Sequence, residues 1–196
     1  MSFQQDKYEV VRNAISEELI SLIQISAEIL ESAYMSEYKK GLKNFFPFGD
    51  EQVKNSFANY SPNYSESLMV YLKPLMQEIT GKDLHESYTY VRTYYNGAVL
   101  DRHTDRPSCE ISATICLQKD ETPWPIYFEN LDGETVEVEL NDGDMIVYSG
   151  IILPHWRNAY EGEKHRQIFT HYVDANGKYG KSHRYDGRKA LSLRKS

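Results

Sequence analysis

His103 and Asp105 stand two residues apart, at the end of a stretch that begins with Tyr94. If this segment is extended, both side chains point to the same face, because side chains alternate along a strand. One imidazole and one carboxylate on a shared face supply two ligands of a 2-His-1-carboxylate facial triad. Such a triad binds non-haem Fe(II) and leaves coordination positions open. The pair therefore predicts a metal site if a second histidine joins it.

His155 can complete this ligand set. It follows a turn at 141–144, an apolar run at 145–148 and a short linker, so a buried strand would lead the chain towards it. A His-x-Asp pair also arises by chance in roughly one such chain in three, and an incidental pair in a solvated turn is the alternative. The other histidines have no ligand-spaced partner and are predicted to be surface or packing residues; they include His85, His165, His171 and His183.

Arg166 follows His155 after a turn at Gly162 and opens an apolar strand, residues 166–173. The planar guanidinium pairs at two points with a carboxylate, so an arginine at the mouth of such a strand is predicted to bind an anion. A structural ion pair with a nearby acid explains the residue equally well.

Two helices are predicted to support this region. Apolar residues fall at helical spacing from Ser16 to about Tyr34, behind a Ser16 cap and an acidic first turn. A second helix begins near Ser65 and ends at Gly81, and Pro74 should kink or shorten it. Neither helix carries residues that suggest chemistry.

The segment 35–64 between the helices lacks periodicity and is rich in Gly, Pro, Asn and aromatic residues. We expect irregular structure there, with at most a short helical piece at 51–57. Loops of this length in compact domains are often lids or binding loops.

After Gly81 the sequence changes to short apolar and aromatic runs separated by turn residues, which is typical of antiparallel β folds. The predicted strands are residues 87–95, 111–117, 125–129, 135–140, 145–148, 153–157 and 166–173. The pattern favours an α+β, mainly β class with a helix-flanked jelly roll. We expect one domain over 1–196, with helical support and loop at 1–82, a jelly-roll core at 83–175 and a basic tail at 176–196.

The composition excludes several protein classes. Of 196 residues, 40% are hydrophobic and 26% charged, as in ordinary globular domains. No apolar run is long enough to cross a bilayer, and the polar start lacks the layout of a secretory signal. Two cysteines suggest no disulfide framework. We therefore expect a cytoplasmic protein without a membrane partner.

Charge argues against a nucleic-acid partner. The net charge of −7 does not suit a general phosphate-binding surface. The tail from Lys178 to Ser196 is the exception, because its cations face a single acid, Asp186. Such a run is more typical of a solvated end than of a nucleic-acid arm, which stays a minor alternative.

In order and spacing, residues 87–173 resemble the Fe(II)- and 2-oxoglutarate-dependent dioxygenases, and within them the prolyl 4-hydroxylase-like branch. The matching positions are Tyr94, Gly97, His103, Asp105, Gly143, Asp144, His155, Gly162 and Arg166. The resemblance implies a double-stranded β-helix with N-terminal helices packed outside. This agrees with the architecture that the patterns favour.

The resemblance also implies roles for residues. The three predicted metal ligands would hold Fe(II), and Arg166 would bind the C5 carboxylate of 2-oxoglutarate. Tyr94 is similar to a family tyrosine that helps to line the cosubstrate pocket, and Thr170 lies on the strand face of Arg166. Many collagen-type members carry lysine at the position of Arg166, whereas related sensor-type hydroxylases use arginine.

Three residues are predicted substrate contacts from their positions. Arg106 follows the aspartate ligand, Trp156 follows the distal histidine, and Tyr95 belongs to an aromatic run that suits a groove. An ion pair is the structural alternative for Arg106, and core packing is the alternative for Trp156.

The activity that the resemblance implies is hydroxylation of a prolyl residue in a peptide or protein, with conversion of 2-oxoglutarate and O2 to succinate and CO2. Ascorbate is a candidate further requirement. Related iron sites oxidise free amino acids, other peptide side chains and alkylated nucleobases, so these substrates stay open. A non-catalytic β-sandwich that binds a metabolite or sugar is the alternative from another class. The sequence leaves the oligomeric state open.

Overall fold

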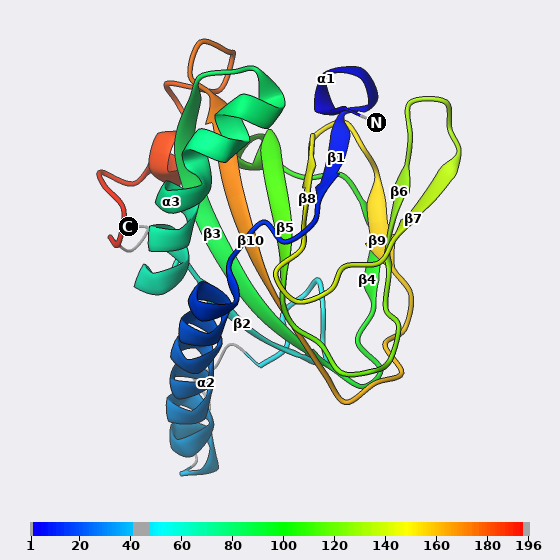
Figure 1. Cartoon of the computed structure of the whole chain (residues 1–196). Helices are drawn as coiled ribbons and strands as arrows, with labels where there is room; N and C mark the ends of the chain where they lie inside the picture. Colours follow the sequence, from blue (N-terminus) through cyan, green and yellow to red (C-terminus); the bar gives the residue numbers. More distant parts are fainter. Residues whose placement is uncertain (1, 41–47, 194–196) are drawn as a thin grey trace.

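The core of the protein is a pair of antiparallel β-sheets that face each other (Figure 1). The computed structural model describes residues 2–40 and 48–193. In spatial order, the larger sheet contains β1 (Tyr8–Val11), β8 (Met145–Tyr148), β5 (Ile111–Gln118), β10 (Lys164–Asp174), β3 (Leu84–Tyr95) and β2 (Ser56–Tyr60). The smaller sheet contains β4 (Leu100–His103), β9 (His155–Arg157), β6 (Ile126–Glu129) and β7 (Thr135–Val138). The predicted jelly roll is confirmed.

Helices α2 (Glu17–Lys39) and α3 (Asn63–Thr80) lie beside the larger sheet, and the short α1 (Phe3–Asp6) precedes β1 (Figure 1). One hydrophobic core joins the helices to the outer face of this sheet; its buried members include Ile20, Ile23, Leu72, Met76, Val91, Ile115 and Ile168. Burying each large aliphatic side chain contributes about 1.5–3 kcal/mol. In the part of the chain described, no helix is both long and apolar enough to cross a membrane.

Helix α2 begins as predicted and ends later. The hydroxyl of its N-cap Ser16 accepts a hydrogen bond from the Leu19 N–H at 3.4 Å. The helix continues past Tyr34 to Lys39. The aromatic side chain of Tyr34 packs against Phe57 of β2, at 5.7 Å between ring centroids. Tertiary packing thus extends the helix beyond the predicted boundary.

Helix α3 starts two residues before the predicted cap and runs through Pro74. The Ser65 hydroxyl lies 2.6 Å from the Thr89 hydroxyl on β3 rather than capping the helix. Pro74 leaves the carbonyl of Val70 without its helical donor, but Val70 is 46% exposed. Water can reach this carbonyl, so the helix tolerates the proline.

Two strands, β1 and β2, form where the sequence predicts none. The helical piece expected at 51–57 is wrong, because residues 56–60 form β2 and pair with β3. Pairing with a long neighbouring strand overrides local propensity here. Residues 41–47 of the expected loop lie outside the described residues.

Side chains on β3 and β10 alternate between two environments. On β10, Phe169 and His171 face the space between the sheets, whereas Ile168 and Tyr172 enter the outer core beneath the helices. On β3, Tyr88, Tyr90, Arg92 and Tyr94 face inwards. The face of the strand on which a residue lies therefore decides whether its side chain can reach a site between the sheets.

The Gly143-Asp144 element of the resemblance has a structural role. Gly143 has φ +85°, and a Cβ there would lie 2.5 Å from Cδ1 of Ile20 in α2. The Asp144 carboxylate accepts hydrogen bonds from the backbone N–H of Asn13 at 3.0 Å and forms an ion pair with Arg12 at 2.7 Å. This turn therefore ties the segment after β1 to the start of β8.

The C-terminal tail returns to the body through η3 (Arg184–Gly187), which packs on β3. Asp186 is buried and forms an ion pair with Arg106 at 2.6 Å. Arg188 is also buried and pairs with Glu66 of α3 at 2.7 Å. The prediction of a solvated end is therefore wrong for these two tail residues.

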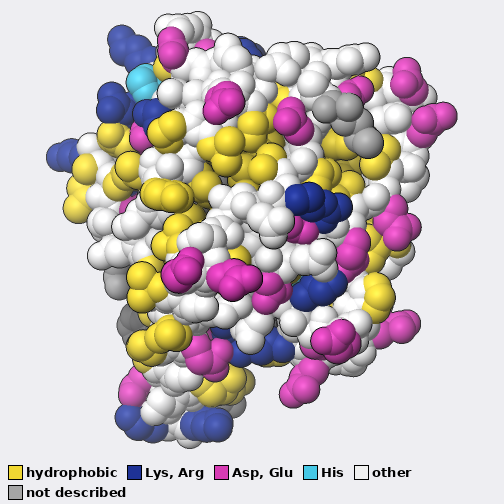
Figure 2. Space-filling model, in the orientation of Figure 1, with side chains coloured by type: hydrophobic (Ala, Val, Ile, Leu, Met, Phe, Trp, Pro, Cys, Tyr) yellow, Lys and Arg dark blue, Asp and Glu magenta, His cyan; other side chains and the backbone are white. Residues whose placement is uncertain are grey.

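Figure 2 shows acidic side chains over much of one face, with Lys and Arg at its upper left edge, at its lower end and at separate places in its middle. Figure 1 places the C-terminal part of the chain on that side of the molecule. On this face the basic side chains form no continuous stripe across the body.

Candidate metal centre

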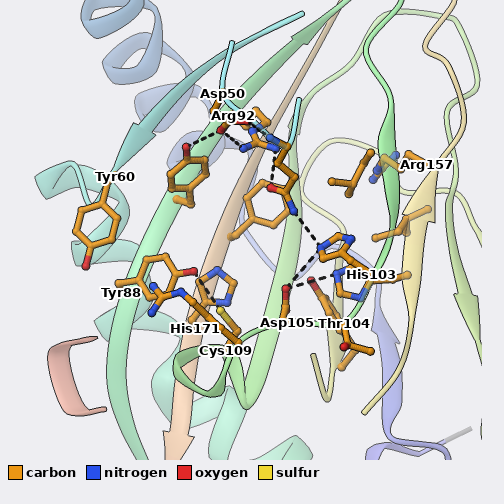
Figure 3. A pocket seen from close by; sticks show the side chains of 18 of the residues that line it. Asp50, Tyr60, Tyr88, Arg92, His103, Thr104, Asp105, Cys109, Arg157 and His171 are labelled. Carbon is orange, nitrogen blue, oxygen red and sulfur yellow. Dashed lines mark hydrogen bonds and ion pairs between the residues drawn. The ribbon is translucent and has the colours of Figure 1, made fainter. Parts of the chain in front are cut away.

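A cavity of about 420 Å³ lies between the two sheets (Figure 3). Side chains of β3 and β10 line one wall, and β4, β9 and the segment after β4 line the other. Figure 3 shows Arg157 on one side of His103 and Asp105, and the group formed by Tyr88 and His171 on the other. The cavity therefore extends in two directions from the predicted metal ligands.

The three predicted metal ligands meet in this cavity. His103 ends β4 and lies directly opposite His155 of β9 in the strand register, and Asp105 follows two residues later. Oδ1 of Asp105 lies 3.7 Å from Nε2 of each histidine. The potential ligand atoms are all within 4.8 Å of one another. Two imidazoles and one carboxylate on one side of a common point form the facial arrangement expected for Fe(II).

Hydrogen bonds orient both imidazoles. Nδ1 of His103 lies 2.7 Å from the Asp101 carbonyl oxygen, and Nδ1 of His155 lies 3.0 Å from the Leu153 carbonyl oxygen. Carbonyls only accept, so each Nδ1 carries the proton and each Nε2 presents a lone pair to the cavity. Burial lowers the pKa of His155, against the opposing effect of Asp105. His155 is therefore neutral near pH 7, as a metal ligand must be.

Asp105 is held from two sides. Its N–H donates to the Gly150 carbonyl at 2.8 Å, and the Ser112 hydroxyl donates to Oδ2 at 3.4 Å. A Cβ at Gly150 would lie 2.1 Å from Oδ2 of Asp105 and 2.7 Å from the Cys109 carbonyl oxygen. Only glycine allows the loop before β9 to approach the carboxylate this closely.

Cys109 and His171 form a second potential ligand group with the same Asp105. The Cys109 sulfur lies 3.1 Å from the Tyr88 hydroxyl, and burial raises the pKa of the thiol. Metals bind the thiolate, which this environment disfavours. Burial also lowers the pKa of His171 to about 4. Of the two groups, the one with Cys109 therefore needs a thiol to lose its proton before it can bind a metal, whereas the one with His103 and His155 contains no thiol.

The segment before β2 reaches the edge of the metal centre. The Gln52 side-chain nitrogen lies 3.1 Å from Nε2 of His103, and its oxygen accepts a hydrogen bond from Arg92 at 3.1 Å. Asp50 forms an ion pair with Arg92 and accepts a hydrogen bond from the Tyr90 hydroxyl at 3.0 Å. Figure 3 shows this polar chain running from β3 to His103.

Arg106 lines the cavity, but its guanidinium is already engaged. It makes two hydrogen bonds to Asp186, at 2.6 and 3.0 Å, and lies 4.4 Å from the ring centroid of Tyr88. Tyr60 donates to Asp186 at 2.8 Å and stacks on Tyr88 at 5.2 Å between centroids. Asp186 of the tail therefore holds Arg106 and Tyr60 beside Tyr88, and these side chains form one wall of the cavity.

Arg166 does not reach this cavity. Its guanidinium pairs with Glu31 of α2 and with Glu28 at 2.9 Å, and it donates to the Thr93 hydroxyl at 3.0 Å and to Gln118 at 3.1 Å. The side chain is 1% exposed. Because side chains alternate along β10, Arg166 points to the helices and away from the cavity. This orientation contradicts the predicted cosubstrate role. The structural ion pair is the alternative that the structure contains.

Three other predicted contacts also face away. Thr170 lies opposite Ala113, a member of the outer core. The Tyr95 hydroxyl donates a hydrogen bond to Glu31 of α2. Trp156 stacks on a tyrosine of β6 at 5.7 Å between centroids and does not line the cavity. Alternation places each of them on the opposite face from a cavity residue.

Arg157, which directly follows Trp156 and is a candidate from the sequence for the mouth of the substrate site, lines the cavity and is 2% exposed. It follows His155 by two residues on β9, so the alternation that relates His103 to Asp105 also relates these two residues. That spacing was the available signal. Tyr94, which was predicted to line a cosubstrate pocket, does line this cavity and is fully buried.

No family model and no curated protein matches the sequence. Solved structures do match. A prolyl-4-hydroxylase from Pseudomonas putida matches with a TM-score of 0.68 at 12% identity, over 88% of this chain and 95% of that chain. The non-heme alpha ketoglutarate dependent epimerase SnoN from nogalamycin biosynthesis matches with a TM-score of 0.72 at 13% identity, over 88% and 78%.

A third similar structure is HygX from Streptomyces hygroscopicus, with nickel and 2-oxoglutarate bound. Its TM-score is 0.67 at 10% identity, over 89% of this chain and 85% of that chain. At these identities the likeness establishes the fold, and the chemistry has to be argued from the side chains of this chain.

Proposed function

We propose that this chain, which has the fold of the 2-oxoglutarate and Fe(II) oxygenases, is itself an Fe(II)- and 2-oxoglutarate-dependent dioxygenase. The observation that carries the proposal is the convergence of His103, Asp105 and His155 on one point inside a cavity. An incidental His-x-Asp pair would not be expected to face a second histidine across a strand register.

The donor set fits the proposed metal. Two neutral imidazole nitrogens and one carboxylate oxygen suit ferrous iron, and three ligands on one face leave three positions open. The hydrogen bonds from Nδ1 of His103 and His155 to backbone carbonyls keep their Nε2 lone pairs available. When bound, Fe(II) with 2-oxoglutarate would activate O2 and yield succinate, CO2 and a hydroxylated product.

The residues of this chain would position the reactants and exclude water. Asp105, held by Ser112 and by the Gly150 backbone, would keep the metal at the centre of the cavity. The aromatic wall of Tyr60 and Tyr88 would pack against the substrate on the side remote from Arg157.

For the substrate, the proposal is a prolyl residue in a peptide or protein. An apolar ring suits the stacked Tyr60 and Tyr88, and the fold is similar to that of a prolyl-4-hydroxylase. HygX, a similar structure solved with hygromycin B bound, keeps a small-molecule substrate as the competing class. A gain of one oxygen in proline-containing peptides, measured by mass spectrometry, tests the proposed class. Oxidation of free amino acids or nucleosides instead would contradict it.

An anaerobic titration tests the metal and cosubstrate chemistry. Fe(II) and then 2-oxoglutarate are added to the protein, and the visible charge-transfer band of the chelated keto acid is recorded. Asp105→Ala should abolish the band. Asp132→Ala removes an exposed carboxylate in the turn between β6 and β7 and should leave the band unchanged. Succinate formation from 2-oxoglutarate under O2 provides the second readout.

A band in both the parent and Asp132→Ala, together with its loss in Asp105→Ala, supports the proposal. No band in the parent at saturating Fe(II) and keto acid would refute it and favour the non-catalytic binding module. A band that survives in Asp105→Ala would place the metal elsewhere.

A further inference from the structure

Three arginines line the cavity, and they differ in their partners. Arg92 pairs with Asp50, and Arg106 pairs with Asp186. Within residues 2–40 and 48–193, Arg157 forms no ion pair with a carboxylate. It is therefore the cavity arginine whose guanidinium forms no ion pair within the described part of the protein.

The buried guanidinium of Arg157 is only partly satisfied by hydrogen bonds. The residue is 2% exposed, its Nη1 donates to the Trp124 carbonyl, and its Nε has no hydrogen-bond partner. The guanidinium also lies 4.5 Å from the Trp124 ring centroid. Burying a guanidinium without an ion pair is unfavourable, so an anionic ligand would stabilise Arg157.

A second donor without a partner lies beside Arg157. Tyr94 is fully buried, lines the same cavity, and its hydroxyl has no hydrogen-bond partner. Both side chains contact the indole of Trp124, Tyr94 at 4.8 Å between ring centroids. Two unsatisfied donors at one place form a site for an acceptor with two oxygens, such as a carboxylate.

The position of Arg157 fits one end of a ligand whose other end binds the metal. His155 and Arg157 are alternate residues of β9, so their side chains point to the same face roughly 6.6 Å apart along the strand. This separation is of the order of the length of a five-carbon diacid. Apolar Leu100, Ile126 and Phe169 also line the cavity and could contact the methylene groups between the two ends.

We infer that Arg157, together with the Tyr94 hydroxyl, binds the distal carboxylate of the 2-oxo diacid cosubstrate, so that metal and cosubstrate are both held from β9. This inference rests on the proposed function. In this role Arg157 replaces Arg166, which the resemblance implied. Arg166 lies on the face of β10 that points away from the cavity.

The test compares two keto acids on each variant. Fe(II)-loaded protein is titrated anaerobically with 2-oxoglutarate and with 2-oxobutyrate, which lacks the distal carboxylate, and the charge-transfer band reports binding of both. Arg157→Gln should weaken 2-oxoglutarate about 100-fold, as expected for the loss of a two-point charged contact. The affinity for 2-oxobutyrate should change less than about threefold.

Two further variants complete the comparison. Tyr94→Phe should weaken 2-oxoglutarate about fivefold with little effect on 2-oxobutyrate, because it removes one hydrogen bond. Arg166→Gln is the matched control and should leave the ratio of the two affinities unchanged. If Arg157→Gln fails to fold, Tyr94→Phe decides the question through the same ratio.

The possible outcomes separate the two proposals. Loss of selectivity for 2-oxoglutarate in Arg157→Gln, with 2-oxobutyrate still bound, supports the inference and verifies that the metal site is intact. Unchanged selectivity in Arg157→Gln, or lost selectivity in Arg166→Gln alone, overturns it while the dioxygenase proposal stands. Failure of the parent to give a band with either keto acid refutes the proposed function itself.

Discussion

Single residues in this protein take their roles from the partners that surround them. Arg157 and Arg166 have the same side chain and are both almost fully buried. Arg166 has Glu28 and Glu31 as counter-charges, so its charge is compensated within the fold. Arg157 forms no ion pair among the described residues, and its Nε has no hydrogen-bond partner. We therefore expect Arg166 to contribute to stability, and we propose the ligand-binding role for Arg157.

Removing Arg166 should destabilise the fold without abolishing metal binding. Arg166→Ala leaves Glu31, whose side chain is 9% exposed, without its main counter-charge. Breaking a buried pair from one side costs about 3–5 kcal/mol. Urea unfolding measures the loss, and the double variant Arg166→Met with Glu31→Leu should recover much of it. A loss below about 1 kcal/mol would contradict a structural role.

His165 should make the stability depend on pH. Burial lowers its pKa from 6.5 to about 2, so the folded protein keeps it neutral while the unfolded chain takes up a proton below pH 6.5. Its contribution is present above pH 6.5 and is lost as the pH falls. Between pH 7 and 5 the free energy of unfolding should drop by about 2 kcal/mol more in the parent than in His165→Gln. Equal drops in urea unfolding would contradict this assignment.

At the scale of elements, the direction of side chains could be predicted within one short segment. It could not be predicted between two strands that a loop separates. His103 and Asp105 belong to one short segment, so alternation alone related their side chains. The parity of Arg166 relative to His155 depends on the path through the intervening loop, and β10 shifts register against β5 beside Arg166. A shift of one residue exchanges the two faces of a strand. This is why the convergence of His103, Asp105 and His155 could be predicted and the direction of the Arg166 side chain could not.

The edge strands β1 and β2 could not be predicted from the sequence, for a related reason. β1 and β2 are the two ends of the larger sheet, and each pairs with a strand distant in sequence. Short strands of this kind have weak periodicity of their own, and their pairing with β8 and β3 stabilises them. The central strands, which are buried apolar runs, were predictable from the sequence alone.

The loop before β9 sets the position of Asp105, which gives a prediction about Gly150. A Cβ at Gly150 would lie 2.1 Å from Oδ2 of Asp105, so Gly150→Ala must displace the carboxylate. We expect at least a tenfold loss of affinity for Co(II) as a substitute for Fe(II), measured by calorimetry. Gly133→Ala is the control for backbone strain, because Gly133 has φ +81° but a Cβ there meets nothing within 4 Å. Equal metal affinities in the two variants would contradict the prediction.

At the scale of the whole molecule, the C-terminal tail is part of the folded domain. Asp186 holds Arg106 and Tyr60 at the cavity wall, and Arg188 compensates the buried Glu66. The tail therefore links helix α3, strand β3 and the segment after the metal ligands. Its remaining exposed cations lie on a protein of net charge −7.

A chain that ends after Ser182 should be markedly less stable. It lacks Asp186 and Arg188, so Glu66 and Arg106 lose their counter-charges. A loss of about 3–5 kcal/mol corresponds to a Tm lower by roughly 10 °C for a domain of this size. Lys181→Ala, which removes an exposed cation, should change Tm by less than about 2 °C. A truncated chain with the Tm of the parent would show that the tail does not stabilise the fold.

The contact between Gln52 and His103 makes metal binding an exchange of partners. The Gln52 amide lies 3.1 Å from the Nε2 atom that would ligate the metal, so an arriving ion must displace it. The apparent affinity is then lower than the intrinsic one by the free energy of a hydrogen bond, about 1 kcal/mol. Gln52→Ala should therefore bind metal about fivefold more tightly, the opposite of the usual result when a polar cavity residue is removed, and weaker binding in calorimetry would contradict this. In the parent, the Gln52 amide nitrogen would leave Nε2 of His103 as the ion enters, while Asp50 keeps its contacts with Arg92 and Tyr90.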